Sequence, residues 1–135
     1  ENFDPNAPIT RAEFATICAR FDHSSVEGTE SFSDIHGHWA EKFVERAAAL
    51  GWVNGYMDGT FRPNATITRA EAMAMINRVL GRLPESEKDL LPGMKTWPDN
   101  ADPSAWYYLT IQEAANGHTF ERKADGVHER WIKLK

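Results

Sequence analysis

The sequence predicts a mainly α-helical chain built from helix–loop–helix repeats, with a short β-hairpin near the C-terminus. Residues 3–12 (FDPNAPITRA) and 61–70 (FRPNATITRA) repeat at an offset of 58 residues, which is the size of a helical repeat unit. Apolar residues recur at helical spacing in each unit. Asp125-Gly126 is a dipeptide that favours a tight turn between two strands.

Four helices are expected from the apolar spacing. The best defined covers residues 39–50, where apolar side chains recur from Trp39 to Leu50 and Gly51 follows the last turn. The other three cover residues 11–21, 69–80 and 105–116.

The hairpin is expected around Asp125-Gly126. Counting outward from a two-residue turn places opposite charges and two aromatic rings across from each other, which are favourable cross-strand neighbours. The expected pairs are Ala124 with Val127, Arg122 with Glu129, Glu121 with Arg130, and Phe120 with Trp131.

The chain is expected to hold one complete repeat between two partial ones. A looser repeat relates the FSD motif and the tryptophan after it to the later WPD motif and its tryptophan, with two extra residues in the second copy. The expected divisions are the second half of a repeat (1–31), a complete repeat (32–82), a surface linker rich in charge, proline and glycine (83–96), and a divergent partial repeat that ends in the hairpin (97–135).

Composition excludes several classes of protein. The net charge of −5 argues against a binder of duplex nucleic acid, which normally presents a basic face. No apolar run approaches the roughly 18 residues that a membrane-spanning helix needs. Cys18 is the only cysteine, so an intrachain disulfide and a CxxC metal site are excluded, and its apolar neighbours predict a buried thiol.

No cofactor, metal site or catalytic group is expected. His36 and His38 lie near Asp34, but no further ligand follows at a recognisable spacing, and such residues usually cap a helix or face solvent. The sequence has no P-loop, Rossmann fingerprint or nucleophile elbow. We therefore expect a binding protein rather than an enzyme.

The TRAE motif predicts the start of a helix in both copies. Thr10 with Glu13, and Thr68 with Glu71, have the spacing of a capping box. In that motif the threonine hydroxyl accepts from the backbone N–H three residues on, and the glutamate accepts from the backbone N–H of the threonine. Helix capping therefore explains these four residues.

The arginines of the two motifs are not explained by capping. Arg11 and Arg69 take the first helical position, where the helix dipole disfavours positive charge by roughly 0.3–1 kcal/mol. Each could stack on an aromatic ring or pair with Asp34 or Asp99. Alternatively, a forked guanidinium at a helix N-terminus could bind a carboxylate or phosphate of a ligand. Both explanations stay open.

Residues 32–82 resemble a complete S-layer homology domain. The stretch before them matches only the second half of such a domain, and residues 97–117 loosely match only the first half. The landmarks of the resemblance are FSD at 32–34, Trp39-Ala40, the glycines Gly51 and Gly55, DGTFRP at 58–63, and ITRAE at 67–71.

The resemblance implies a pseudo-symmetric bundle whose inter-repeat grooves bind a secondary cell-wall polysaccharide, commonly one with an acidic pyruvylated sugar. It also implies an extracellular location at a bacterial cell wall or S-layer. The ligand-binding residues that it implies are Arg11, Asp34 and Trp39 around the first groove, and Arg69, Asp99 and Trp106 around the second.

Two other functions stay open. The hairpin and the tryptophan-rich last repeat could form the docking surface of a protein–protein interaction module, and the wall ligand could be peptidoglycan instead of the polysaccharide. The incomplete repeats also leave self-association open.

Overall fold

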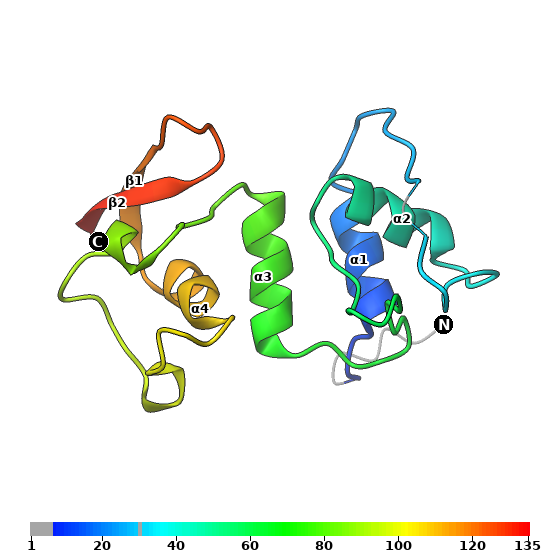
Figure 1. The fold of residues 1–135 in the computed structure, drawn as a ribbon, viewed down its shortest axis with the longest axis horizontal. Coiled ribbons are helices and arrows are strands. Elements are labelled where there is room, and N and C mark those ends of the chain that lie inside the picture. Colours follow the sequence, from blue (N-terminus) through cyan, green and yellow to red (C-terminus); the bar gives the residue numbers. More distant parts are fainter. Residues whose placement is uncertain (1–6, 30) are drawn as a thin grey trace. The chain divides into compact units, whose positions relative to one another are not determined.

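The computed structural model describes residues 7–29 and 31–135. Within them lie four α-helices, two 3-10 helices and one two-stranded antiparallel sheet (Figure 1). The elements are α1 (Arg11–Ala19), α2 (Glu41–Ala49), α3 (Arg69–Val79), η1 (Glu87–Asp89), η2 (Pro98–Asn100), α4 (Tyr108–Ala115), β1 (His118–Arg122) and β2 (Glu129–Leu134). The predicted mainly α fold with a C-terminal hairpin is confirmed. In the described part of the chain, no helix combines the length and apolar character needed to cross a bilayer.

The chain folds as two compact units, residues 1–68 and 69–135, here called the first and second unit. Helix α1 packs against α2 in the first unit, and α3 packs against α4 in the second (Figure 1). Helices α1 and α3 follow the TRAE motifs, whereas α2 and α4 follow the FSD and WPD motifs. Each unit therefore pairs a helix that starts at a TRAE motif with a helix that follows an FSD or WPD motif.

Small side chains hold α1 and α2 together. Alanines line the buried faces of both helices, which lets two helix axes approach closely. The buried alanines are Ala12, Ala15 and Ala19 on α1, and Ala40 and Ala47 at α2. Cys18 is also buried, and this burial raises the pKa of its thiol. The predicted buried thiol is confirmed.

The core of the second unit forms where the hairpin meets α4 and the segment around η1. Leu90, Tyr108 and Trp131 are buried together at its centre. Four partly buried side chains pack around them: Leu91, Met94, Leu109 and Leu134. Because large aromatic side chains contribute most of the apolar area buried in a small core, Trp131 is the main anchor of β2.

The hairpin has the predicted strand register. The sheet pairs Arg122 with Glu129, Glu121 with Arg130, and Phe120 with Trp131. A register shift between Thr119 and Phe120 then alters the pairing further along.

The turn of the hairpin is longer than predicted. Residues 123–128 lie between the strands, so the expected pair of Ala124 and Val127 is wrong. The side chain of Asp125 explains the difference, because its Oδ1 accepts from the backbone N–H groups of Val127 and His128, both at 2.9 Å. The Asp125 side chain thus closes the turn together with two backbone bonds, from the Gly126 N–H to the carbonyl of Lys123 at 3.0 Å and from the Lys123 N–H to the carbonyl of His128 at 2.9 Å.

Two helices begin later than predicted. Helix α2 begins at Glu41, and the N–H of that residue closes a turn on the carbonyl of His38 at 3.1 Å. Helix α4 begins at Tyr108, after a similar turn that closes on Ala105 at 3.0 Å. Both exposed tryptophans of the motifs therefore lie just ahead of a helix rather than within it.

Candidate functional site

Arg11, at the first position of α1, is buried inside the first unit and only 5% exposed. Its Nε donates to the carbonyl of Phe61 at 2.9 Å, and its Nη2 donates to the carbonyl of Asn54 at 3.1 Å. Its Cζ lies 4.8 Å from the ring centroid of Tyr56 and 4.7 Å from that of Phe61. Of the two explanations for this arginine, these contacts match stacking on aromatic rings.

Protein groups also occupy the N-terminus of α1. Thr10 Oγ1 accepts from the N–H of Glu13 at 3.1 Å, and the Glu13 carboxylate accepts from the N–H of Thr10 at 3.3 Å. The first two N–H groups of the helix donate to the carbonyls of Ala65 and Pro63, at 2.8 and 3.0 Å. An anion at this helix end would have to displace those carbonyls.

Asp34 holds the loop that covers Arg11. Its Oδ1 accepts from the N–H of Phe61 and its Oδ2 from the N–H of Arg62, both at 2.8 Å. The backbone of Arg62 is left-handed, with a φ of 56°, and is the only non-glycine position of positive φ among the described residues. The carboxylate of the FSD motif thus fixes the DGTFRP loop in an unusual conformation.

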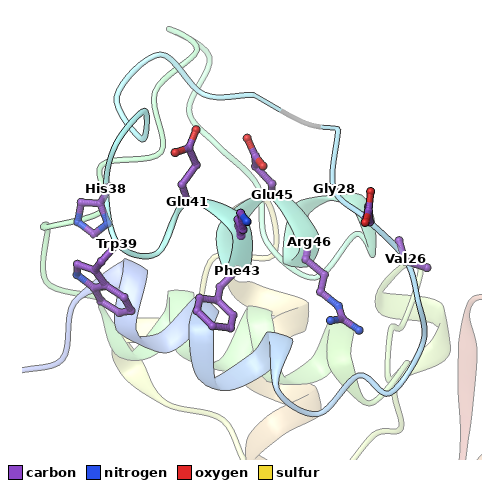
Figure 2. Close-up of a pocket in the computed structure, with 10 residues that line it drawn as sticks. Val26, Gly28, His38, Trp39, Glu41, Phe43, Glu45 and Arg46 are labelled. Atoms are coloured by element: carbon purple, nitrogen blue, oxygen red, sulfur yellow. The ribbon is translucent and has the colours of Figure 1, made fainter.

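Trp39 borders a groove of about 610 Å³ between α2 and the segment at residues 26–28 (Figure 2). Its indole is 61% exposed. Figure 2 shows Glu41 and Glu45 projecting on one side of α2 and Phe43 on the other. An exposed aromatic face at the border of a groove has the chemistry to bind a sugar, because the ring can stack against the apolar face of the sugar.

Two features fix the wall of this groove against α2. Arg46 donates to Asp22 Oδ2 through Nε at 3.0 Å and Nη2 at 2.5 Å, and it also donates to the carbonyl of Ser24. Hydrogen bonds from Ser24 and Arg46 lower the pKa of Asp22 to about 2. Gly28 passes so close to the helix that an added Cβ would lie 2.2 Å from the carbonyl carbon of Glu45.

The two histidines ahead of α2 are engaged in hydrogen bonds. His38 Nδ1 accepts from the N–H of Ala40 at 3.1 Å, so its Nε2 carries the proton and donates to Asn64 Oδ1 at 2.9 Å. His36 Nδ1 lies 3.2 Å from a carboxylate oxygen of Glu41. Both rings therefore organise the start of the helix.

The second unit places its predicted site residues at the surface. Arg69 and Asp99 are exposed, and Trp106 is 62% exposed with its ring edge-on to Tyr107 at 5.6 Å. Arg69 differs from Arg11 in its exposure although both begin a TRAE helix. The last repeat lacks the DGTFRP sequence that supplies the covering loop in the first unit. The predicted capping pair of Thr68 and Glu71 stays a prediction.

The second unit also holds a buried charged cluster that was missed in the sequence. Arg82 Nε lies 2.6 Å from Glu129 Oε2, and Arg82 Nη2 lies 3.0 Å from Glu113 Oε1. His118 Nε2 is 3.1 Å from an oxygen of each carboxylate. Trp131 Nε1 donates to Glu113 at 2.8 Å. The cluster thus ties the hairpin to α4 and to the chain after α3.

Burial and hydrogen bonding shift the pKa values of the Glu113 and Glu129 carboxyl groups in opposite directions. Burial, together with the hydrogen bond to Glu129, raises the pKa of Glu113 to about 7. The pKa of Glu129 is instead lowered below its usual value. Burial alone would raise this pKa, but the hydrogen bonds to the carboxylate, of which the one from Arg82 has the largest effect, outweigh burial. Glu113, His118 and Glu129 have metal-ligand chemistry and lie close enough together to hold an ion. The Arg82 guanidinium already supplies a positive charge there.

The amino-acid sequence is similar to proteins of bacterial surfaces. Residues 1–15 and 31–73 match the S-layer homology domain. Over 98% of this chain, the identity is 37% to "Cell surface glycoprotein 1" and 38% to "Cellulosome-anchoring protein", both from Acetivibrio thermocellus. "Outer membrane protein SlpA" of Thermus thermophilus is 45% identical over 62 residues, which are 45% of this chain and 7% of that protein.

The chain corresponds to a small part of these relatives. It spans 6% of the length of the surface glycoprotein and 30% of the anchoring protein. The residues that match the family model contain both TRAE motifs and the FSD motif. The chain belongs to the S-layer homology domain family.

Proposed function

We propose that this module anchors its parent protein to the bacterial cell surface by binding secondary cell-wall polysaccharide. A non-catalytic anchoring role agrees with the S-layer homology family and with a relative named as a cellulosome-anchoring protein. The observation that carries the polysaccharide proposal is the pair of exposed indoles, Trp39 and Trp106, which follow the FSD and WPD motifs. A solvent-facing tryptophan supplies a large flat apolar face, which suits stacking against a sugar ring.

The polar residues of the motifs divide into two roles. Arg69 is exposed at the start of α3, where a guanidinium and a helix N-terminus together favour an acidic group such as the carboxylate of a pyruvylated sugar. Asp99 lies in η2, two residues after Trp97. In the first unit, Arg11 and Asp34 shape the DGTFRP loop. We propose that this loop and Trp39 form the corresponding part of the binding surface.

Alanine variants of the exposed residues test this proposal. Trp39→Ala, Trp106→Ala and Arg69→Ala are each expected to weaken co-sedimentation with purified cell walls at least tenfold, a loss of about 1.4 kcal/mol. Leu80→Ala is the matched control, because Leu80 is apolar and 65% exposed but lies just beyond the end of α3, outside the FSD, WPD, DGTFRP and TRAE motifs. Arg11→Ala is a poorer test, because a buried side chain is removed and the fold itself is weakened.

The same variants separate the other functions. If the tryptophan variants bind walls as tightly as the unmodified chain, stacking on the polysaccharide is refuted. If they lose affinity equally for walls from which the polysaccharide has been extracted, the ligand is peptidoglycan.

A further inference from the structure

Arg62 is the arginine of the DGTFRP loop itself, and it differs from Arg11 in its exposure and in its hydrogen-bond partners. The Arg11 guanidinium donates to two backbone carbonyls and lies between two rings at 5% exposure. Turning it toward a ligand would leave the carbonyls of Phe61 and Asn54 without these donors, and buried acceptors without a donor are costly. Arg11 therefore acts as a support for the loop.

The Arg62 side chain is presented to solvent. It is 51% exposed, and its Cζ lies 3.7 Å from the ring centroid of Tyr56. Its partner Asp58 is 55% exposed, and the closest approach of the two charges is 3.4 Å. An ion pair between groups this exposed contributes little to stability, so the guanidinium can exchange Asp58 for an anion of a ligand. The Tyr56 ring meanwhile supports the plane of the guanidinium.

The backbone of Arg62 is a second, independent indication. A φ of 56° favours glycine, and a side chain there costs conformational energy unless neighbouring contacts enforce it. Asp34 enforces it by accepting the N–H groups of both Phe61 and Arg62. A long cationic side chain at a position where glycine is easier points to a use for that side chain.

The loop also brings Arg62 to the segment that carries Trp39. Asp34 binds the loop at Arg62, and Asn64 binds His38, the residue before Trp39, at 2.9 Å. From these contacts we infer that Arg62 is the residue of the first unit that binds the acidic carboxylate of the polysaccharide. The inference rests on the proposed function and names the cation of that same surface.

Arg62→Gly is the decisive variant. Glycine adopts a φ of 56° without strain, so the variant is expected to unfold at the same urea concentration as the parent chain or at a higher one. Its affinity for purified cell walls is expected to fall at least tenfold, because the charge-assisted hydrogen bonds to the carboxylate are lost. Arg62→Lys should recover only part of the affinity, since lysine lacks the planar fork.

Arg20→Ala is the matched control. Arg20 is also an exposed arginine of the first unit that lies over an aromatic ring, with its Cζ 5.7 Å from the centroid of Phe43. The Arg20→Ala substitution removes the same charge as Arg62→Gly and is expected to leave wall binding unchanged. Treating the walls with mild acid, which hydrolyses ketal-linked pyruvate, should weaken binding of the parent chain by a larger factor than binding of Arg62→Gly, which keeps only the Arg69 contact.

The outcomes separate this inference from the proposed function. If Arg62→Gly binds walls as tightly as the parent chain while Trp39→Ala does not, Arg62 is not the anion contact and the anchoring function stands. If Arg20→Ala weakens binding as much as Arg62→Gly, general charge attraction explains the loss and the inference fails. If the parent chain does not bind walls at all, the proposed function fails first.

Discussion

Replacing Glu113 by glutamine is expected to remove a pH dependence from the stability of the second unit. Glu113 is buried and faces Arg82, His118, Glu129 and Trp131. Burial and the hydrogen bond to Glu129 raise its pKa from 4.5 to about 7. The folded chain therefore holds the Glu113 proton more tightly than the unfolded chain does.

The sign of the effect follows from this difference in proton binding. Between pH 4.5 and about 7 the folded state binds more protons at this site than the unfolded state, so stability falls as pH rises. The stabilisation is complete below pH 4.5 and is lost as pH rises through about 7. At about 1.36 kcal/mol per pKa unit, the whole loss is roughly 3 kcal/mol. Glu129 has a lowered pKa, so its own contribution is lost only in acid below pH 4.5.

Urea unfolding followed by tryptophan fluorescence measures this effect. We expect the free energy of unfolding of the unmodified chain to fall by roughly 3 kcal/mol between pH 4.5 and pH 8, and that of Glu113→Gln to change much less over the same range. At pH 8 the variant should be at least as stable as the parent, because glutamine mimics the neutral acid. Equal pH dependence in the two proteins would refute the assignment of a retained proton to Glu113.

Three further predictions concern the first unit. Arg11→Met should destabilise the chain by about 2–4 kcal/mol, because two buried carbonyls lose charged donors; an unchanged urea midpoint would contradict a supporting role. Asp34→Ala should cost about 2 kcal/mol and speed amide exchange at Phe61 and Arg62, and unchanged exchange would show that the loop holds itself. Arg46→Ala should release the segment around Ser24, detected as faster proteolytic cleavage there; cleavage at the parental rate would mean that other contacts hold it.

Patterns that are local in the sequence predicted local structure well. The Thr10–Glu13 spacing corresponds to a capping box in the structure, and the charges and rings of the hairpin gave its strand register. Both depend on residues that are neighbours along the chain or across one turn. The length of the hairpin turn was missed because an Asp125 side chain closes it, and turn propensity alone does not distinguish that from a two-residue turn.

Burial of charged residues could not be predicted in the same way. Glu129 was expected to pair with Arg122 across the hairpin, but its side chain is buried against Arg82, which lies 47 residues away. Arg122 instead donates to the carbonyls of Gly81 and Val127. The strand register fixes which Cα atoms face each other, whereas the packing of the hairpin on the rest of the unit decides where the side chains go.

The two TRAE arginines make the same point for the candidate site. Their local sequences are nearly identical, yet Arg11 is buried and Arg69 is exposed. The difference comes from a loop more than 40 residues further along the chain, which contributes Asn54 and Phe61. A short motif therefore predicts the start of the helix but does not by itself assign the arginine to a ligand.

The central claim is that the module binds secondary cell-wall polysaccharide. Its most direct test is to measure the fraction of the chain that sediments with purified cell walls before and after the polysaccharide is extracted from them. We expect the chain to sediment with intact walls and to stay in the supernatant with extracted walls. Equal sedimentation with both preparations would contradict the claim.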